Sequence, residues 1–91
     1  MTVPYVIVVT KKYDNDFERC RKRRKDIDKL EFVIRALRWG RRLEPKYKQH
    51  KLQGKYKGRW ECHIEPDWVL IWVIKQNRLI LERTGTHSDL F

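Results

Sequence analysis

The chain has few cysteine, proline and glycine residues. It contains 2 Cys, 3 Pro and 4 Gly among 91 residues. Cys20 and Cys62 lie far apart, the first in a helical pattern and the second in a strand pattern, so no disulfide scaffold is indicated. We therefore expect reduced thiols and a cytoplasmic protein. The sequence also lacks internal repeats and low-complexity tracts, and its hydrophobic fraction of 41% argues against disorder.

Long apolar runs are absent as well. The apolar stretch at residues 3–9 is too short to span a bilayer, and no cationic region precedes it. It is followed by Lys11 and Lys12. We expect a first β-strand here, and we expect neither a signal nor a membrane segment.

Acidic residues are scarce relative to basic ones. The chain has 22 Lys and Arg against 12 Asp and Glu, a formal net charge of +10. Between Arg19 and Arg59 there are 17 basic and 4 acidic residues, so the excess is localised. Such a field attracts polyanions, and nucleic acid is the commonest polyanion in a cell. The alternative is a solvated basic face that serves solubility or an acidic protein partner.

The order of the predicted elements is βααβββ. Residues 5–9 form a run of β-formers and predict the first strand. The first helix begins after Thr10, and the second begins at Asp26 or Asp28 and ends at Gly40. Later strands are expected at residues 60–64, 69–74 and 78–84.

These elements predict a single α+β domain over residues 1–91, in which the helix pair covers one face of a small sheet. The strand at 69–74 is apolar on both faces and should be central. The segment from 41 to 58 has no periodicity, and a connection of that length is usually functional or disordered. It contains His50, so we expect an ordered functional loop.

The candidate site residues gather around the predicted strand ends. His63 and Asp67 flank one turn, and Arg83 and His87 leave the exposed end of a neighbouring strand if the strands form a meander. Strict alternation places Arg83 on the face of Leu79 and Leu81, and the register decides whether that face is also that of His63. A single histidine is more often structural than catalytic, but this combination favours a catalytic site.

These residue types match the needs of RNA cleavage without a metal. One group must take the 2′-hydroxyl proton, another must protonate the departing 5′-oxygen, and a cation must stabilise the phosphate. Imidazoles suit the first two tasks, and Arg83 suits the third. Asp67 would favour a charged imidazole. Trp68 and Phe91 could stack on nucleobases, although Trp68 could equally be a core residue and Phe91 could simply pin the chain end.

Other chemistries are less well supported. The possible metal ligands include the histidines, Asp67 and Cys62, but no pair has a close ligand spacing, so we expect no metal and no cofactor. A serine hydrolase is also disfavoured, because Ser88 lies beside His87 without an elbow motif.

Three motifs run through the C-terminal half of the chain. Their residues are His50, Leu52, Gly54, Tyr56, Lys57, Gly58, Glu61, Cys62, His63, Ile64, Pro66, Asp67, Trp68, Leu70, Ile71, Trp72, Leu81, Arg83, Thr84, Gly85, Thr86, His87, Ser88, Leu90 and Phe91. These motifs resemble the YafQ branch of the RelE/ParE superfamily, whose members are toxins of bacterial type II toxin–antitoxin modules. The N-terminal half is similar mainly in its strand–helix–helix pattern and basic character.

This resemblance implies a RelE-like fold, a small antiparallel-dominated β-sheet with two N-terminal helices packed on one face. It implies an mRNA interferase that cuts messenger RNA in the ribosomal decoding site, without a metal, by attack of the 2′-hydroxyl. Adenine-rich lysine codons are the expected targets. The implied partners are a cognate antitoxin, the ribosome with its ribosomal RNA, and mRNA.

The resemblance also implies residue roles. The positions that match His50, His63, Asp67 and His87 form the proton-transfer set of the family. We favour His50 or His63 as the base and His87 as the acid. The position that matches Arg83 steadies the phosphate. The positions that match Trp68 and Phe91 help to position the RNA.

Two other functions remain open at this stage. One is a ParE-like toxin with the same fold that binds DNA gyrase, which would not need three histidines, an aspartate and an arginine at one end of the sheet. The other is an RNA- or ribosome-binding module that binds but does not cut.

Overall fold

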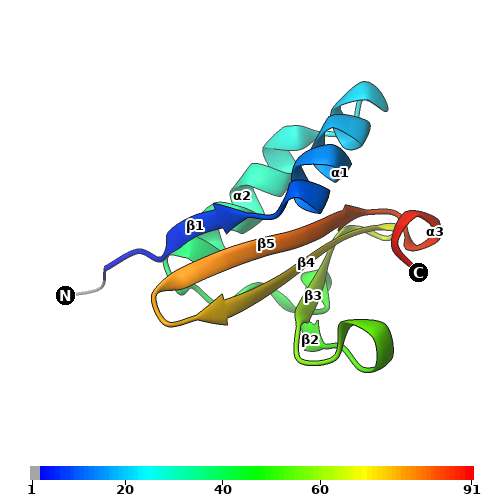
Figure 1. Ribbon diagram of the computed structural model, residues 1–91. Coiled ribbons are helices and arrows are strands. Elements are labelled where there is room, and N and C mark those ends of the chain that lie inside the picture. The colour runs from blue at the N-terminus through cyan, green and yellow to red at the C-terminus, as the bar shows by residue number, and fades with distance from the viewer. Residues whose placement is uncertain (1–2) are drawn as a thin grey trace.

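The computed structural model describes residues 3–91 as a mixed sheet with two helices on one face and a short helix at the C-terminal end (Figure 1). The order of the predicted elements is confirmed, and further short elements appear. The elements are β1 (Val6–Val9), α1 (Lys11–Lys22), α2 (Ile27–Arg38), a 3-10 turn (Pro45–Tyr47), β2 (His50–Lys51), a second 3-10 turn (Gly54–Tyr56), β3 (Trp60–Glu65), β4 (Trp68–Lys75), β5 (Arg78–Gly85) and α3 (His87–Leu90).

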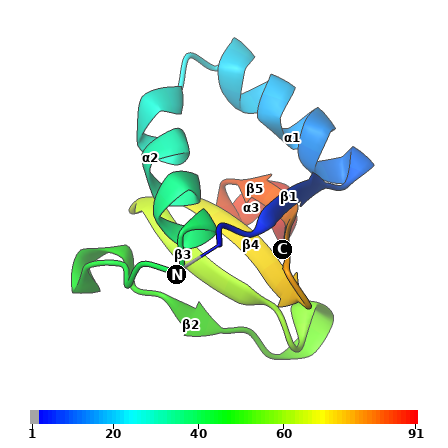
Figure 2. The same ribbon diagram turned by 90° about the vertical axis from the view of Figure 1, so that its left-hand side faces the viewer.

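The strands lie in the order β1-β5-β4-β3-β2. Strand β1 runs parallel to β5, and the other three pairings are antiparallel. Helices α1 and α2 lie together above the sheet, while β2 forms the far edge (Figure 2). The predicted α+β class, dominated by antiparallel pairing, is therefore confirmed.

The helices begin and end where the sequence signals place them. The Thr10 side chain accepts a hydrogen bond from the backbone N–H of Tyr13 and so caps α1. Gly40 follows α2 with a φ of +68°, a left-handed conformation that favours glycine. Both helices bury one apolar stripe against the sheet, and their buried apolar residues are Tyr13, Cys20, Leu30, Val33 and Leu37.

The opposite face of the sheet carries a second, smaller apolar cluster. Val69 and Ile71 of β4 are fully buried there, under Tyr56 and Leu90. Leu90 comes from α3, and Tyr56 comes from the second 3-10 turn. Both faces of β4 are thus covered, which explains why its sequence is apolar on both faces.

A β-bulge between β4 and β5 changes the side on which Arg83 lies. Leu81 pairs with Trp72, and Arg83 pairs with the neighbouring Ile71, so Glu82 is the extra residue of β5. Because consecutive residues of β4 face opposite sides, Leu81 lies on the face covered by the main core and Arg83 lies on the other face. From there the guanidinium of Arg83 reaches Asp16 of α1 at the edge of β5. The prediction from strict alternation, which placed Arg83 with Leu81, is wrong because of this bulge.

The segment that lacked periodicity is built from two 3-10 turns and the short strand β2. Helix α3 was not predicted, although Thr86 and Asp89 form a capping box in which each side chain accepts from the backbone N–H of the other. Within residues 3–91, no helix is long and apolar enough to cross a membrane.

Candidate active site

The face of the sheet turned away from α1 and α2 carries a row of polar residues. His50 of β2 pairs with Glu61 of β3, Glu61 pairs with Ile71 of β4, and Ile71 pairs with Arg83 of β5. Residues directly opposite one another in a ladder lie on the same face. Antiparallel pairing therefore brings His50, Glu61 and Arg83 to one surface. Because it carries the candidate active site, we call it the catalytic face.

The other two histidines join this row from its end. His63 lies two residues after Glu61 on β3 and so on the same face. The ring of His63 is centred 6.4 Å from that of His50 and 5.6 Å from that of His87, the first residue of α3. The predicted gathering of the three histidines is what the structure shows.

Each imidazole is held through its Nδ1 atom. The Nδ1 of His50 lies 2.7 Å from the carbonyl oxygen of Lys48, and that of His63 lies 3.1 Å from the carbonyl oxygen of Pro66. A carbonyl oxygen can only accept, so each of these Nδ1 atoms carries a proton. The Nε2 atoms are left as the sites at which His50 and His63 can gain or lose a proton.

His87 is held in the same way by Asp67. The carboxylate Oδ1 of Asp67 accepts from both the backbone N–H of His87, at 3.0 Å, and its Nδ1–H, at 2.8 Å. These two bonds, the backbone bond first, hold the pKa of Asp67 below its ordinary value. Asp67 is therefore ionised at neutral pH, and Nε2 is the ring nitrogen of His87 that Asp67 does not hold.

Glu61 is a member of the site that sequence analysis missed. Its side chain is buried, with an Oε1 atom 3.3 Å from Nε2 of His50 and 3.7 Å from Nε2 of His63. Its other oxygen, Oε2, is buried without a hydrogen-bond partner among the described residues. The signal was the position of Glu61 two residues before the candidate His63 on β3, because residues two apart in a strand share a face.

Arg83 is less exposed than expected. Its guanidinium donates from Nε and Nη2 to the two oxygens of Asp16, at 2.6 and 3.0 Å, and from Nη1 to the hydroxyl of Tyr56 at 3.0 Å. The side chain is 15% exposed, so the expectation of an exposed strand end is wrong for this residue. The hydrogen bonds with Asp16 raise the pKa of Arg83 above its ordinary value, which keeps the guanidinium charged.

The two aromatic candidates differ in their surroundings. Trp68 is fully buried in the main core, where its indole N–H donates to the hydroxyl of Thr84 at 2.9 Å. A tryptophan buried in this way cannot stack on a nucleobase, so Trp68 is the core residue that the sequence analysis gave as the alternative. Phe91 is 57% exposed, and its ring lies 5.9 Å from that of His87 and 5.3 Å from that of Tyr56. It remains available to a nucleobase.

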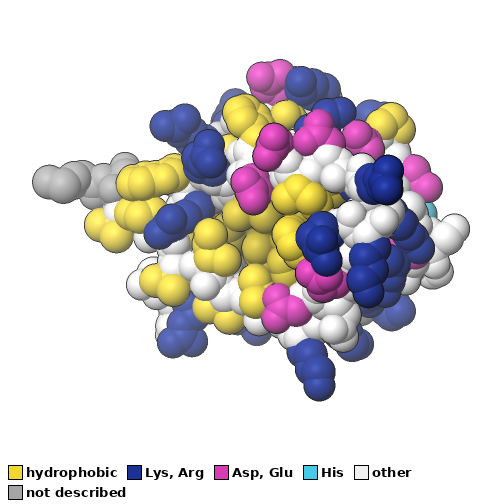
Figure 3. Space-filling view, turned by 90° about the horizontal axis from the view of Figure 1, so that it is seen from above, with side chains coloured by type: hydrophobic (Ala, Val, Ile, Leu, Met, Phe, Trp, Pro, Cys, Tyr) yellow, Lys and Arg dark blue, Asp and Glu magenta, His cyan; other side chains and the backbone are white. Residues whose placement is uncertain are grey.

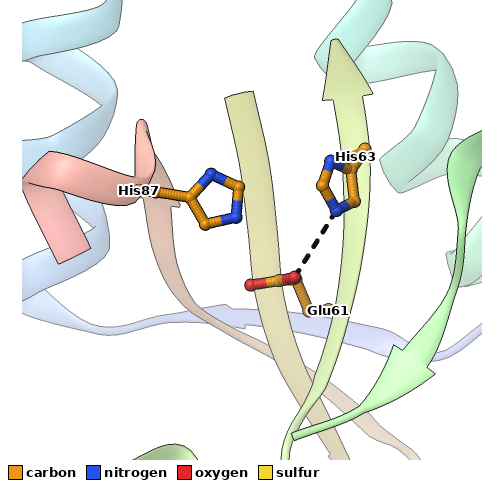
Figure 4. A group of neighbouring side chains, drawn as sticks. All are labelled: Glu61, His63 and His87. Atoms are coloured by element: carbon orange, nitrogen blue, oxygen red, sulfur yellow. Dashed lines mark ion pairs between the residues drawn. The ribbon is translucent and has the colours of Figure 1, made fainter. Parts of the chain in front are cut away.

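Three residues of the catalytic face could hold a metal ion. One ligand atom from each of Glu61, His63 and His87 lies within 4.8 Å of the others (Figure 4). Sequence analysis did not identify this set, because Glu61 was not among its candidate ligands and His87 of α3 meets His63 of β3 only in the fold. In metal-binding histidines, the ring nitrogen that does not bind the metal usually donates its N–H to a protein acceptor. His63 and His87 do so through Nδ1.

Residues 5–91 match the family described as "Bacterial toxin of type II toxin-antitoxin system, YafQ". The chain belongs to this family. It is 42% identical over 80 residues to the mRNA interferase toxin YafQ of Escherichia coli K12, with 87% of each chain covered. The expected YafQ-like identity is thereby confirmed.

Solved structures of YafQ-family proteins have the same fold. The structure of the E. coli DinJ–YafQ toxin–antitoxin complex matches at 39% identity and a TM-score of 0.89, over 98% of this chain and 99% of that one. A copper-bound mutant toxin from Helicobacter pylori matches at 38% identity and a TM-score of 0.90, over 96% of this chain and 99% of that one. The RelE-like fold expected for this YafQ-family chain is therefore confirmed as well.

Proposed function

We propose that this YafQ-family toxin is an mRNA endoribonuclease that acts by acid–base catalysis on translated messages. The observation that carries the proposal is that His50, His63 and His87 are each fixed through Nδ1, so that Nε2 is the ring nitrogen left to exchange a proton. Three imidazoles so arranged beside a guanidinium supply a base, an acid and a cation on one face.

The proposed reaction balances its protons without another reactant. Nε2 of His50 or His63 takes the proton of the 2′-hydroxyl, and the 2′-oxygen attacks the neighbouring phosphorus. The bond from phosphorus to the 5′-oxygen breaks, and that oxygen takes a proton from Nε2 of His87. The products are a 2′,3′-cyclic phosphate and a free 5′-hydroxyl, and Arg83 neutralises the phosphate oxygens during the transfer.

Glu61 assists this reaction without touching the phosphate. Its Oε1 lies within ion-pair distance of Nε2 of both His50 and His63. A carboxylate there can accept from whichever imidazole has just gained a proton. We therefore assign Glu61 the role of orienting the base and stabilising its cationic form.

The chemistry is tested with synthetic messages bound to ribosomes. A 2′-deoxynucleotide at the cleaved position should abolish cutting, because the attacking oxygen is gone, and the normal product should carry a 2′,3′-cyclic phosphate. A bridging 5′-sulfur at the cleaved bond leaves without protonation. It should restore cleavage by the His87→Gln variant and leave the variant that lacks the base, His50→Gln or His63→Gln, slow. Full cutting of the deoxy message would refute the mechanism, and rescue of the base variant equal to that of His87→Gln would refute the assignment of the acid.

The reaction as proposed uses side chains and no metal. An ion held by Glu61, His63 and His87 would occupy the Nε2 atoms that must exchange protons, so we expect Cu²⁺ or Zn²⁺ to inhibit. The copper-bound H. pylori relative supports the idea that toxins of this fold can take such ions. A chelator selective for transition metals should leave cleavage unchanged while magnesium keeps the ribosome intact. Loss of cutting that only zinc or manganese restores would contradict the metal-free mechanism.

The ribosome is the proposed site of action. The catalytic face is a small open surface of the sheet, whereas the 17 basic residues between Arg19 and Arg59 extend over both helices and the segment that follows them. Such a distribution suits binding to ribosomal RNA over a broad area, while Phe91 and its neighbours contact the message. Adenine-rich lysine codons are the proposed targets.

A cognate antitoxin is the proposed protein partner. The face that includes the two helices presents apolar side chains at its middle, bordered by Lys and Arg side chains together with Asp and Glu side chains (Figure 3). Phe32 and Trp39 are large exposed apolar residues on and just after α2. An acidic, amphipathic segment would complement such a surface. The complex of the E. coli relative with DinJ supports this assignment. Co-purification from the native operon tests it, and free toxin at full expression in healthy cells would contradict it.

A further inference from the structure

Asp16 is a buried carboxylate on α1 that takes no part in the proposed proton transfers. Its side chain is 1% exposed. The Nε and Nη2 atoms of Arg83 donate to its two oxygens, so the pair is bidentate. This geometry fixes the plane of the guanidinium as well as its position.

Asp16 is itself fixed by the edge of β5. Strand β1 pairs with β5 only as far as Leu81, so the next part of that edge has no strand beside it. There the backbone N–H of Thr84 donates to Oδ2 of Asp16 at 3.2 Å. The carboxylate therefore joins α1 to the backbone of the residue that follows Arg83.

Tyr56 holds the guanidinium from another side. Its hydroxyl accepts from Nη1 of Arg83 and donates to the carbonyl oxygen of Leu90 at 3.3 Å. Leu90 belongs to α3, the helix that begins with His87. The same contacts thus set Arg83 relative to the helix that carries the proposed acid.

Arginine has five N–H donors, and three of those of Arg83 are used by Asp16 and Tyr56. One N–H donor remains on each Nη atom, and these two donors are enough for a two-point contact with a phosphate. We propose that Asp16 is a positioning residue that holds Arg83 so that these two donors meet the scissile phosphate. The proposal rests on the proposed ribonuclease function.

The physical benefit is preorganisation. A free arginine side chain has many rotamers, and ordering it as the transition state forms adds to the barrier of the chemical step. A guanidinium already fixed by a buried carboxylate needs no reorganisation as charge builds on the phosphate. The resulting expectation is a loss in the rate of the chemical step, with little change in binding.

The test compares Asp16→Asn with Asp14→Asn, an exposed aspartate on the same helix whose replacement changes the charge equally. Cleavage of ribosome-bound message is followed in single turnover with enzyme in excess. At saturation, Asp16→Asn should be about ten- to a hundredfold slower than the parent. The half-saturating concentration of folded protein should stay within about twofold, since phosphate contacts elsewhere set the affinity. Asp14→Asn should match the parent.

This design separates positioning from folding. A variant that is merely less folded needs more protein to saturate but reaches the parent's rate, and that result would overturn the proposal. As a second measurement, Asp16→Asn is added to Arg83→Ala. It should slow cleavage no further, because its effect passes through Arg83, and a further loss of about tenfold would also overturn the proposal. A parent protein that does not cut would refute the proposed function itself.

Discussion

At the scale of single residues, the three histidines share one chemical arrangement. Each Nδ1 donates to a fixed acceptor, two of which are backbone carbonyl oxygens. The residue types of the candidate site could be proposed from the sequence, because the proposed reaction requires a base, an acid and a cation. The hydrogen-bond acceptors of His50 and His63 could not be predicted, because a backbone carbonyl has no signature in the sequence.

The same limit applies to Arg83 and Trp68. The bulge that turns Arg83 to the catalytic face inserts a single residue and has no strong sequence pattern. Trp68 lies beside the turn that carries Asp67, and only its burial and its hydrogen bond to Thr84 show that it belongs to the core.

Arg83→Ala should lower the free energy of unfolding by about 3 kcal/mol, because it leaves the carboxylate of Asp16 buried without its main partner. Arg59→Ala is the matched control. Its ion pair with Glu82 is half-exposed, so its loss should change stability by less than about 1 kcal/mol. Urea titrations of the parent and of both variants measure the change in the free energy of unfolding.

Adding Asp16→Asn to Arg83→Ala should recover part of the lost stability, since no buried charge remains. An Arg83→Ala variant as stable as the parent would mean that the ion pair contributes nothing to folding. Loss of activity in Arg83→Ala must therefore be measured on protein shown to be folded.

At the scale of elements, the helices and strands follow from capping residues and periodicity, whereas α3 is a four-residue helix too short for a periodic signal. It is held from outside by ion pairs. Asp89 accepts from Arg23 of the turn after α1 at 2.7 Å and from the backbone N–H of Thr86 at 3.0 Å. These contacts fix the helix that carries His87.

Acid should therefore weaken the attachment of α3. The hydrogen bond from Arg23, followed by those from Thr86, holds the pKa of Asp89 well below its ordinary value. A carboxyl group with a lowered pKa stabilises the fold above its unfolded pKa of about 4, and this contribution is lost as the pH falls through the folded value. The parent should lose stability steadily below about pH 4.

Asp89→Asn should show a flatter acid limb than the parent in denaturant titrations at a series of pH values. Glu18→Gln is the control, because Glu18 forms an exposed pair with Arg21 and its protonation should matter less. Equal slopes for Asp89→Asn and the parent would show that Asp89 does not anchor α3.

At the scale of the whole molecule, the chain separates a small catalytic face from a large basic surface. The catalytic face is built from β2, β3, β5 and α3, while the basic excess extends from α1 through residue 59. In the proposed account, phosphate contacts of the basic surface set the position on the ribosome. Contacts near Phe91 then select the codon.

The central claim is that cutting depends on the ribosome and follows the reading frame. The most direct measurement maps the cleavage ends of one message with and without ribosomes, and again after the frame is shifted by one nucleotide. The account predicts cuts only with ribosomes, at adenine-rich lysine codons that move with the frame, and a steep loss of cutting as salt is raised. Efficient cutting of naked RNA at the same sites, indifferent to frame, would contradict it.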